Sequence, residues 1–360
     1  ANFSADMPRK LLYYRLRILA TISTIWILFG IVFYENLSRS TSDLGVELSL
    51  LRFLITFGLV GFIISAVLIF YLKPAFNHKP VGLATLYKLL ITMVLFVVIA
   101  FVLLALYYVL GYKKPLSFAH FFNSFITKIL HTKSFALFLI DMGIMTLLSI
   151  AVLEVTDKYG PGMFWSMVTG EYNAPKVENR IFIFLDINEA TTIAEGLGHE
   201  LYFRMLRKFF KDITMPVLAN DGEIYQYVGD EIVLTWPNTP ENKIKSLKFL
   251  RHMYYLVERK AAEYEQRFQN VPRFKAGVHS GEITAGFVGV LKRELIFSGD
   301  TVNTTARIRG VCHDLNESFV LSGAFMEDFH TPYGYKIKAV GRIYLKGKVE
   351  HTKLYAMRFE

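Results

Sequence analysis

Four long apolar runs in the first part of the chain constrain its fold more than any other feature. They extend over about 18–34, 51–72, 89–110 and 135–153. Each is close to the ~20 residues that a helix needs to span a bilayer. The remainder reads like an ordinary soluble domain, long enough to bury its own core. The sequence therefore predicts an all-α four-helix transmembrane domain over 1–156, a linker over 157–179 and a second domain over 180–360.

The charges around these runs predict their orientation. Basic residues precede the first run, namely Arg9, Lys10, Arg15 and Arg17. Since positive charge marks the cytoplasmic side, both chain ends are expected there, on a multi-pass protein of the cell inner (plasma) membrane. The segment 113–133 argues against this orientation, because its lysines would lie on the external side: Lys113, Lys114, Lys128 and Lys133. An amphipathic helix over 118–130, lying on the membrane surface, would accommodate part of it.

Three further features narrow the function. Asp141 is the one ionisable residue deep within the apolar runs, either as a functional group or as an inward-facing Asp bonded to a neighbouring helix. The net charge of +9 is attributed to basic residues at the cytoplasmic edges of the membrane domain. Because the sequence shows no motif that recognises nucleic acid, no nucleic-acid partner is predicted. The single cysteine, Cys312, excludes an intramolecular disulfide and disfavours a Cys-based zinc site. Any metal must therefore be held by carboxylates.

Two acidic residues fall at the ends of predicted strands. The unbroken apolar run 181–185 predicts a buried central strand, and Asp186 follows it, although a helix N-cap is the alternative for this residue. Strand-like runs at 223–228 and 231–236 are separated only by Gly229 and Asp230, which suits a type II′ hairpin. This hairpin would bring Asp230 close to Asp186. Two carboxylates without a nearby thiol or histidine pair favour Mg²⁺ or Mn²⁺.

Polar residues that suit a triphosphate follow later in the chain. A helix is predicted after 299, with Ser298 or Asp300 as its cap. On it Asn303 and Arg307 are four apart and share one face, where an amide and a guanidinium suit phosphate chemistry. A solvated surface arginine is the alternative. Also predicted are helices over 190–217 and 241–269, strands over 274–279 and 283–290 joined by a turn at 280–282, and a strand pair within 335–357.

Five segments, in order, resemble the catalytic domain of the class III adenylate and guanylate cyclases over about 180–358. They are 184–187, 227–231, 277–281, 299–307 and 345–348. The resemblance implies an α/β fold class, with an α+β ferredoxin-like cyclase catalytic domain. It implies two metal ions per site, Mg²⁺ or Mn²⁺, held by Asp186, Asp230 and the backbone carbonyl of Ile187. It also implies that Asn303 and Arg307 act in the transition state and that Lys346 contacts the terminal phosphates.

The implied function is a membrane-bound adenylate cyclase that converts ATP to 3′,5′-cyclic AMP and pyrophosphate. In this family the metal side and the Asn/Arg side come from different chains, so a homodimer through the catalytic domain is implied. Gln226 and Ile296 stand where the family's adenylate cyclases usually have Lys and Asp or Thr. A guanylate cyclase or one of relaxed specificity therefore stays open. Lys292 or Arg293 would supply the basic residue of the phosphate-facing loop.

Other classes of protein fit less well. The segment 228–232 resembles the signature hairpin of the diguanylate cyclases. That family has no counterpart of the segment 299–307, which disfavours this function. A non-catalytic, cyclase-like membrane sensor would fit the unusual Gln226 and Ile296, although the metal and transition-state residues are retained. A transporter is disfavoured because the four runs show no internal repeat.

Overall fold

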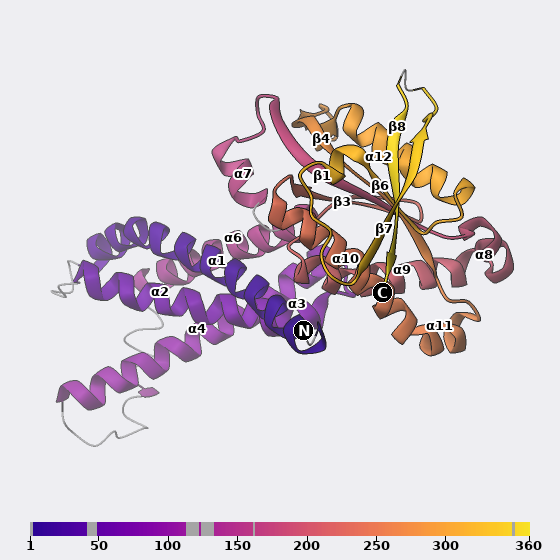
Figure 1. The fold of residues 1–360 in the computed structure, drawn as a ribbon. Coiled ribbons are helices and arrows are strands. Elements are labelled where there is room, and N and C mark those ends of the chain that lie inside the picture. Colours follow the sequence, from indigo (N-terminus) through magenta and orange to yellow (C-terminus); the bar gives the residue numbers. More distant parts are fainter. Residues whose placement is uncertain (1–2, 42–48, 113–121, 124–132, 161–162, 348–349) are drawn as a thin grey trace. The chain divides into compact units, whose positions relative to one another are not determined.

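A computed structural model describes residues 3–41, 49–112, 122–123, 133–160, 163–347 and 350–360 (Figure 1). The chain forms two compact units. One is Leu12–Phe164, and the other consists mainly of Trp165–Glu360. Of the lysines that oppose the predicted orientation, only Lys133 is described; the predicted surface helix over 118–130 lies outside the described residues apart from 122–123.

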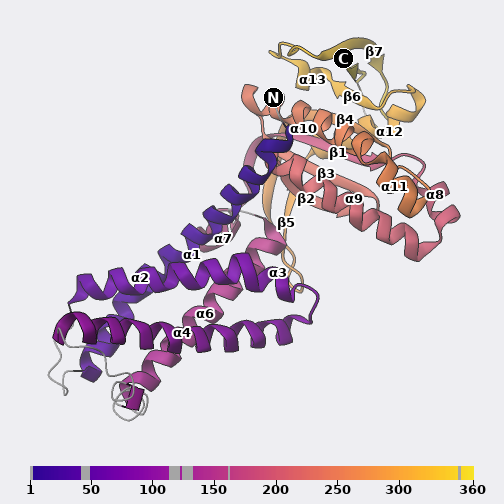
Figure 2. The same cartoon turned by 90° about the horizontal axis from the view of Figure 1, so that it is seen from below.

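The first unit is helical. Its helices are α1 (Phe3–Thr41), α2 (Leu50–Val67), a π-helical turn η2 (Leu68–Leu72), α3 (Lys73–Phe76), α4 (Val81–Tyr112) and α6 (Lys133–Tyr159). Within the described part of the chain, four segments are long and apolar enough to cross a membrane: Leu11–Glu35, Leu50–Phe76, Val81–Leu103 and Phe135–Lys158. The predicted all-α arrangement of four apolar helices is confirmed (Figure 2).

One tryptophan ties these helices together. Trp26 of α1 is fully buried, and its ring centroid lies 5.2 Å from that of Phe57 on α2 and 5.9 Å from that of Phe96 on α4. Its Nε1–H donates to Ser149 Oγ on α6 at 2.9 Å. Packing and interhelical hydrogen bonds are the forces that hold helices together when their surroundings are equally apolar. Asp141 lies half-buried on α6.

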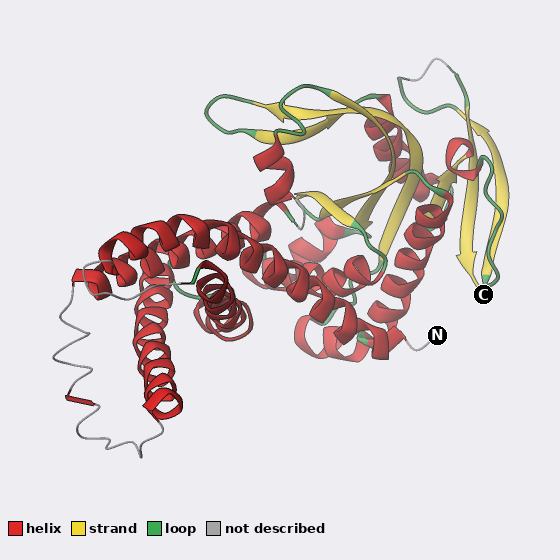
Figure 3. Ribbon diagram, turned by 90° about the vertical axis from the view of Figure 1, so that its left-hand side faces the viewer, coloured by secondary structure: helices red, strands yellow, loops and turns green. Residues whose placement is uncertain are grey.

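The second unit is built on one mixed sheet (Figure 3). Its strands are β1 (Lys176–Ile187), β2 (Glu223–Val228), β3 (Glu231–Pro237), β4 (Phe274–Val288), β5 (Glu294–Ser298), β6 (Phe319–Ser322), β7 (Tyr335–Ile343) and β8 (Thr352–Phe359). The order is β2-β3-β1-β4-β6-β8-β7, and β5 pairs with β4. The four neighbours β4, β1, β3 and β2 are antiparallel, which is the predicted ferredoxin-like arrangement.

Helices connect and cover these strands. They are α7 (Met163–Thr169), α8 (Ala190–Leu197), α9 (His199–Ala219), α10 (Pro240–Arg259), α11 (Ala261–Phe268), α12 (Asp300–Asp314) and α13 (Gly323–Met326). The main apolar core joins residues of β1, β3 and β4 to residues of α9 and α10.

Alternation along β1 decides which way Asp186 points. Every second residue of the strand belongs to the core beneath α9 and α10, namely Ile181, Ile183, Leu185 and Ile187. Phe182 and Phe184 belong to a second cluster, with residues of β5 and partly buried residues of α12. Because side chains in a strand alternate between the two faces, Asp186 lies on the face of Phe184, toward α12.

Three sequence-based predictions of local structure are wrong. No turn forms at 280–282, because β1 begins at Lys176 and pairs with β4 without interruption from Phe274 to Ala285. Helix α12 is capped by Gly299, not by Ser298 or Asp300. The helices predicted over 190–217 and 241–269 are each divided, at Gly198 and at Lys260.

Candidate active site

The structure brings the two predicted metal-binding aspartates into one open pocket of about 410 Å³. Asp186 and Ile187 enter it from the end of β1, and Asp230 enters from the turn between β2 and β3. In that turn Gly229 has φ of +63°, the left-handed conformation that the first residue of a type II′ hairpin needs. Glycine adopts it without strain. The hairpin therefore places Asp230 beside Asp186, as predicted.

The electrostatics of this pair suit a divalent cation. Burial raises the pKa of Asp186 to about 6, assisted by a hydrogen bond with Asp230 and by the negative charge of Asp230, against the lowering effect of Arg309 and Lys275. Two neighbouring carboxylates resist being ionised together, and a cation between them would relieve this repulsion. All donors are oxygen atoms, which fits Mg²⁺ or Mn²⁺.

The pair alone would not complete a coordination shell. Among the described residues, no three His, Cys, Asp or Glu side chains are grouped so that they could hold a metal ion. Mg²⁺ is commonly bound by one or two carboxylates together with substrate phosphates and water. Ile187 also lines the pocket, and its backbone carbonyl is an oxygen donor of the kind that these ions accept.

Four charged residues that line the pocket were not among the predicted site residues: Glu189, Glu231, Lys275 and Arg309. Arg309 on α12 donates from Nη1 to Asp186 Oδ2 at 3.1 Å, and its Nη2 lies 2.7 Å from Glu231 Oε2. Lys275 Nζ lies 3.8 Å from the same Asp186 oxygen. On a helix, Arg309 is rotated about 200° from Arg307. The two arginines therefore lie on opposite faces of the helix. This spacing was the signal in the sequence that could have identified Arg309, because Arg309 must face the sheet if Arg307 does not.

The predicted transition-state residues form a separate group. Asn303 is exposed and Arg307 is half-buried on α12. Arg307 Nη2 lies 3.2 Å from where a Cβ on Gly347 would be, so its guanidinium sits beside the turn that carries the exposed Lys346. Among the described residues, those lining the carboxylate pocket do not include Asn303, Arg307 or Lys346. Within one chain the two sets of residues are thus apart.

The two predicted substrate-binding residues Gln226 and Ile296 lie on strands that approach each other. Gln226 on β2 and Ile296 on β5 are both exposed. Their strands do not pair in the sheet, but the adjacent residues Tyr225 and Phe297 do meet. Their ring centroids are 4.8 Å apart, and the Phe297 N–H donates to Tyr225 Oη at 3.2 Å. This contact positions β2 relative to β5.

Both basic residues predicted for the phosphate-facing loop contact their own chain. Lys292 Nζ lies 2.6 Å from Glu294 Oε1, in an exposed ion pair. Arg293 donates from Nη2 to Asn173 Oδ1 at 2.9 Å, and its guanidinium lies 4.8 Å from the centre of the Phe287 ring. Phosphate contact would require either side chain to leave these partners.

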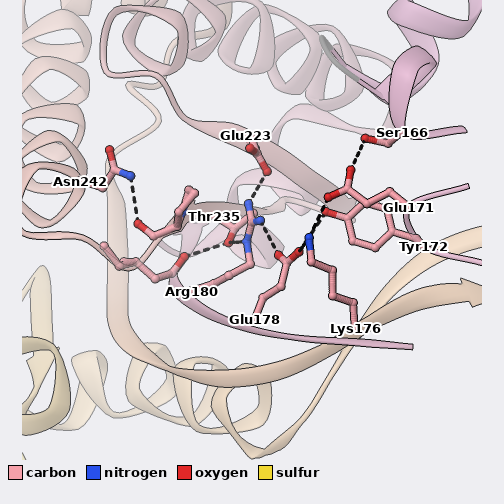
Figure 4. A network of polar contacts seen from close by, with 11 residues as sticks. Ser166, Glu171, Tyr172, Lys176, Glu178, Arg180, Glu223, Thr235 and Asn242 are labelled. Atoms are coloured by element: carbon pink, nitrogen blue, oxygen red, sulfur yellow. Dashed lines mark hydrogen bonds and ion pairs between the residues drawn. The ribbon is translucent and has the colours of Figure 1, made fainter. Parts of the chain in front are cut away.

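A buried arginine fixes the strand that carries Gln226 (Figure 4). Arg180 of β1 donates from Nε to Thr235 Oγ1 of β3 at 3.0 Å and from Nη1 to Glu178 at 3.0 Å. Its Nη2 donates to Glu223 at the start of β2. Because Arg180 is only 5% exposed, water competes weakly for these bonds. One guanidinium thereby joins three strands.

The same network reaches the segment that precedes the sheet. Lys176 Nζ lies 3.2 Å from Glu178 Oε1 and 2.7 Å from Glu171 Oε1. Glu171 in turn accepts a hydrogen bond from Ser166 of α7 at 2.8 Å (Figure 4). The polar network is therefore continuous from α7 through β1 to β2.

The fold and the pocket define the class of protein: a ferredoxin-like α/β domain that presents paired carboxylates at adjoining strand ends, as nucleotide-cyclising domains do. The family model described as the adenylate and guanylate cyclase catalytic domain matches residues 172–358, slightly more than half of the chain. The chain belongs to this family.

Two known proteins resemble about half of the chain. Adenylate cyclase 2 of Rhizobium meliloti (strain 1021) is 34% identical over 202 residues, covering 55% of this chain and 55% of that protein. Adenylate cyclase 1 of the same strain is 30% identical over 178 residues, covering 48% of this chain and 26% of that protein. The chain thus spans about half the length of the first relative and about a quarter of the second.

A solved structure of a bacterial light-regulated adenylyl cyclase superposes with a TM-score of 0.51 at 19% identity. It covers 60% of this chain and 64% of that chain. At this level of identity the likeness supports the fold alone.

Proposed function

We propose that this chain is a membrane-bound adenylate cyclase, which converts ATP into 3′,5′-cyclic AMP and pyrophosphate. The observation that carries the proposal is the convergence of Asp186 and Asp230 in one pocket of a domain of the cyclase family. Both R. meliloti relatives above are named adenylate cyclases, which favours ATP as the substrate. The four apolar helices support anchoring in a membrane. We place the protein in the inner membrane, with the catalytic domain on the cytoplasmic side, because ATP is found there.

Different residues would bind the metal ions, orient the substrate and stabilise the negative charge of the phosphates. The 3′-hydroxyl of ATP attacks the α-phosphorus, and the bond to pyrophosphate breaks. Asp186, Asp230 and the carbonyl of Ile187 would hold two Mg²⁺ or Mn²⁺ ions, which lower the pKa of the hydroxyl and neutralise charge on phosphate oxygens. Asn303 orients the substrate, while Arg307 and Lys346 stabilise negative charge on the α- and terminal phosphates.

The separation of these residues supports a homodimer. Asn303 and Arg307 on α12 do not line the carboxylate pocket of their own chain, and a second copy would bring the two sets of residues together. Several apolar side chains on β2 and around the β4–β5 loop are about half exposed or more: Tyr227, Val228, Val288, Val290 and Leu291. Exposed apolar surface of this kind supports association with a partner.

Gln226 and Ile296 determine the base in this proposal. The side-chain amide of Gln226 offers both a donor and an acceptor to the edge of a purine, whereas Ile296 offers neither. Guanylate cyclase activity or relaxed specificity is the alternative that this pair permits, so ATP and GTP must be compared directly.

The first test is an assay of the purified full chain with Mn²⁺ and either ATP or GTP. We expect cyclic AMP as the main product, and we expect Asp186→Asn to lower the rate by about 10³-fold without loss of folding. Wild-type rates in Asp186→Asn would refute the metal assignment. Absence of any cyclic nucleotide from the wild type would favour the non-catalytic membrane sensor.

A second test addresses the shared sites. Asp186→Asn and Arg307→Ala chains are inactive as homodimers, but their heterodimer retains one intact site of two. Random mixing of equal amounts makes half of the dimers mixed, so about a quarter of the wild-type activity should return. If heterodimers form and the mixture stays inactive, the sites are not shared between chains.

A further inference from the structure

A guanidinium occupies one side of the proposed metal pocket. Arg309 reaches it from α12, with Nη1 3.1 Å from Asp186 Oδ2 and Nη2 2.7 Å from Glu231 Oε2. The side chains of Asp186 and Glu231 are 12% and 11% exposed, against 29% for Arg309. Arg309 therefore makes a charge-assisted hydrogen bond to Asp186 and an ion pair with Glu231, and these two contacts join the end of β1 to the start of β3.

A second cation faces the same carboxylate. Lys275 Nζ lies 3.8 Å from Asp186 Oδ2, and this lysine is 19% exposed. Two positive side chains thus converge on one oxygen of Asp186, which shares the pocket with Asp230. A charge that touches a metal ligand has two opposite effects: it orients the ligand, and it repels the incoming cation.

We propose that Arg309 is a built-in counter-charge of the metal pocket, which keeps its affinity for divalent cations low. Arg309 neutralises Asp186 and Glu231 in the free enzyme, and its positive charge opposes the binding of Mg²⁺ or Mn²⁺ beside Asp186. Repulsion exceeds orientation because Asp186 is already positioned by β1 and does not need Arg309 to reach the pocket. This inference rests on the metal-binding role proposed for Asp186 and Asp230.

The test measures metal binding without nucleotide, so it does not depend on catalysis. Mn²⁺ is titrated into the detergent-solubilised full chain, and free Mn²⁺ is followed by its electron paramagnetic resonance signal. Arg309→Gln keeps a planar donor and removes the charge, so it should bind Mn²⁺ about tenfold more tightly, equivalent to about 1.4 kcal/mol. Arg309→Lys keeps the charge and should stay within about threefold of the wild type.

Two controls make the result specific. Arg342→Gln removes the same charge from an exposed position on β7, at the other end of the sheet, and should leave Mn²⁺ binding unchanged. Asp186→Asn should abolish the binding. If Asp186→Asn binds Mn²⁺ as the wild type does, the proposed metal site itself fails, and the inference about Arg309 fails with it.

The decisive outcome concerns Arg309→Gln alone. If Asp186→Asn loses Mn²⁺ binding but Arg309→Gln binds equally or more weakly than the wild type, the counter-charge is refuted while the metal site stands. Should circular dichroism show that Arg309→Gln is unfolded, Lys275→Gln decides instead. That variant should bind Mn²⁺ about threefold more tightly, and unchanged or weaker binding refutes the inference.

Discussion

Gly277 of β4 lies directly beneath α12, and adding one methyl group there tests how the sheet positions this helix. A Cβ at 277 would lie 2.4 Å from Arg309 N, 2.9 Å from Arg309 Cα and 2.9 Å from Thr305 O. All three are backbone atoms, so no change of rotamer can relieve the clash. Ordinary contact requires at least about 3.4 Å, and α12 must therefore move away by about 1 Å in Gly277→Ala.

This displacement has a cost in stability and a larger one in activity. Overpacking of this kind destabilises by about 1–3 kcal/mol, which for a domain of this size lowers the melting temperature by roughly 3–10 °C. Helix α12 carries Asn303, Arg307 and Arg309, and a shift of about 1 Å in positioning groups lowers a rate by about 10²-fold. The measurements are the rate of cyclic AMP formation from ATP and Mn²⁺ and the thermal unfolding of the solubilised full chain.

The same strand provides a matched control. At Gly286 a new Cβ would meet nothing closer than Pro175 Cα at 3.6 Å, which is an ordinary contact. Gly286→Ala should therefore change stability by less than about 0.5 kcal/mol and leave the rate near that of the wild type. Full activity and an unchanged melting temperature in Gly277→Ala would refute this reasoning, as would an equal loss in Gly286→Ala.

Two further predictions concern polar networks. Burial raises the pKa of Asp212 on α9, but hydrogen bonds from Lys260 at 2.6 Å and Tyr264 at 2.9 Å outweigh it and hold the pKa below its ordinary value. Its stabilising contribution is therefore complete above about pH 4 and is lost as the pH falls through the lowered pKa. Asp212→Asn should lose about 3 kcal/mol of unfolding free energy at pH 7 and nothing at the acid limit; a loss that does not depend on pH in chemical denaturation would contradict this. Arg180→Gln should release Glu223 and β2, and so raise KM for ATP by about tenfold while Mn²⁺ binding stays unchanged; equal effects on both would show general damage instead.

The position of the carboxylates was predictable because it depends on local patterns. An unbroken apolar run marks a buried strand wherever it occurs, and the residue after it emerges at the strand's end. Gly229 and Asp230 between two strand-like runs specify a tight hairpin by their own conformational preferences. These two facts sufficed to bring Asp230 to Asp186.

The continuation of β4 through 280–282 was not predictable from its own residues. Ser280, Gly281 and Glu282 resemble a turn, but β1 offers backbone partners as far as Ala285. Gly281 serves another purpose there, since a Cβ at this position would lie 2.6 Å from Thr301 Oγ1 of α12. Glycine within a strand often marks such a close approach.

By itself the sequence determined the four apolar helices, the central strand β1 with the β2–β3 hairpin, and the carboxylates at their ends, since apolar runs and turns are encoded by neighbouring residues. Tertiary structure decided which charges surround those carboxylates. Arg309 and Asp186 are 123 residues apart and meet only because Gly277 lets the backbone of α12 approach β4. Such contacts depend on the packing of whole elements against one another, so no local pattern along the chain specifies them.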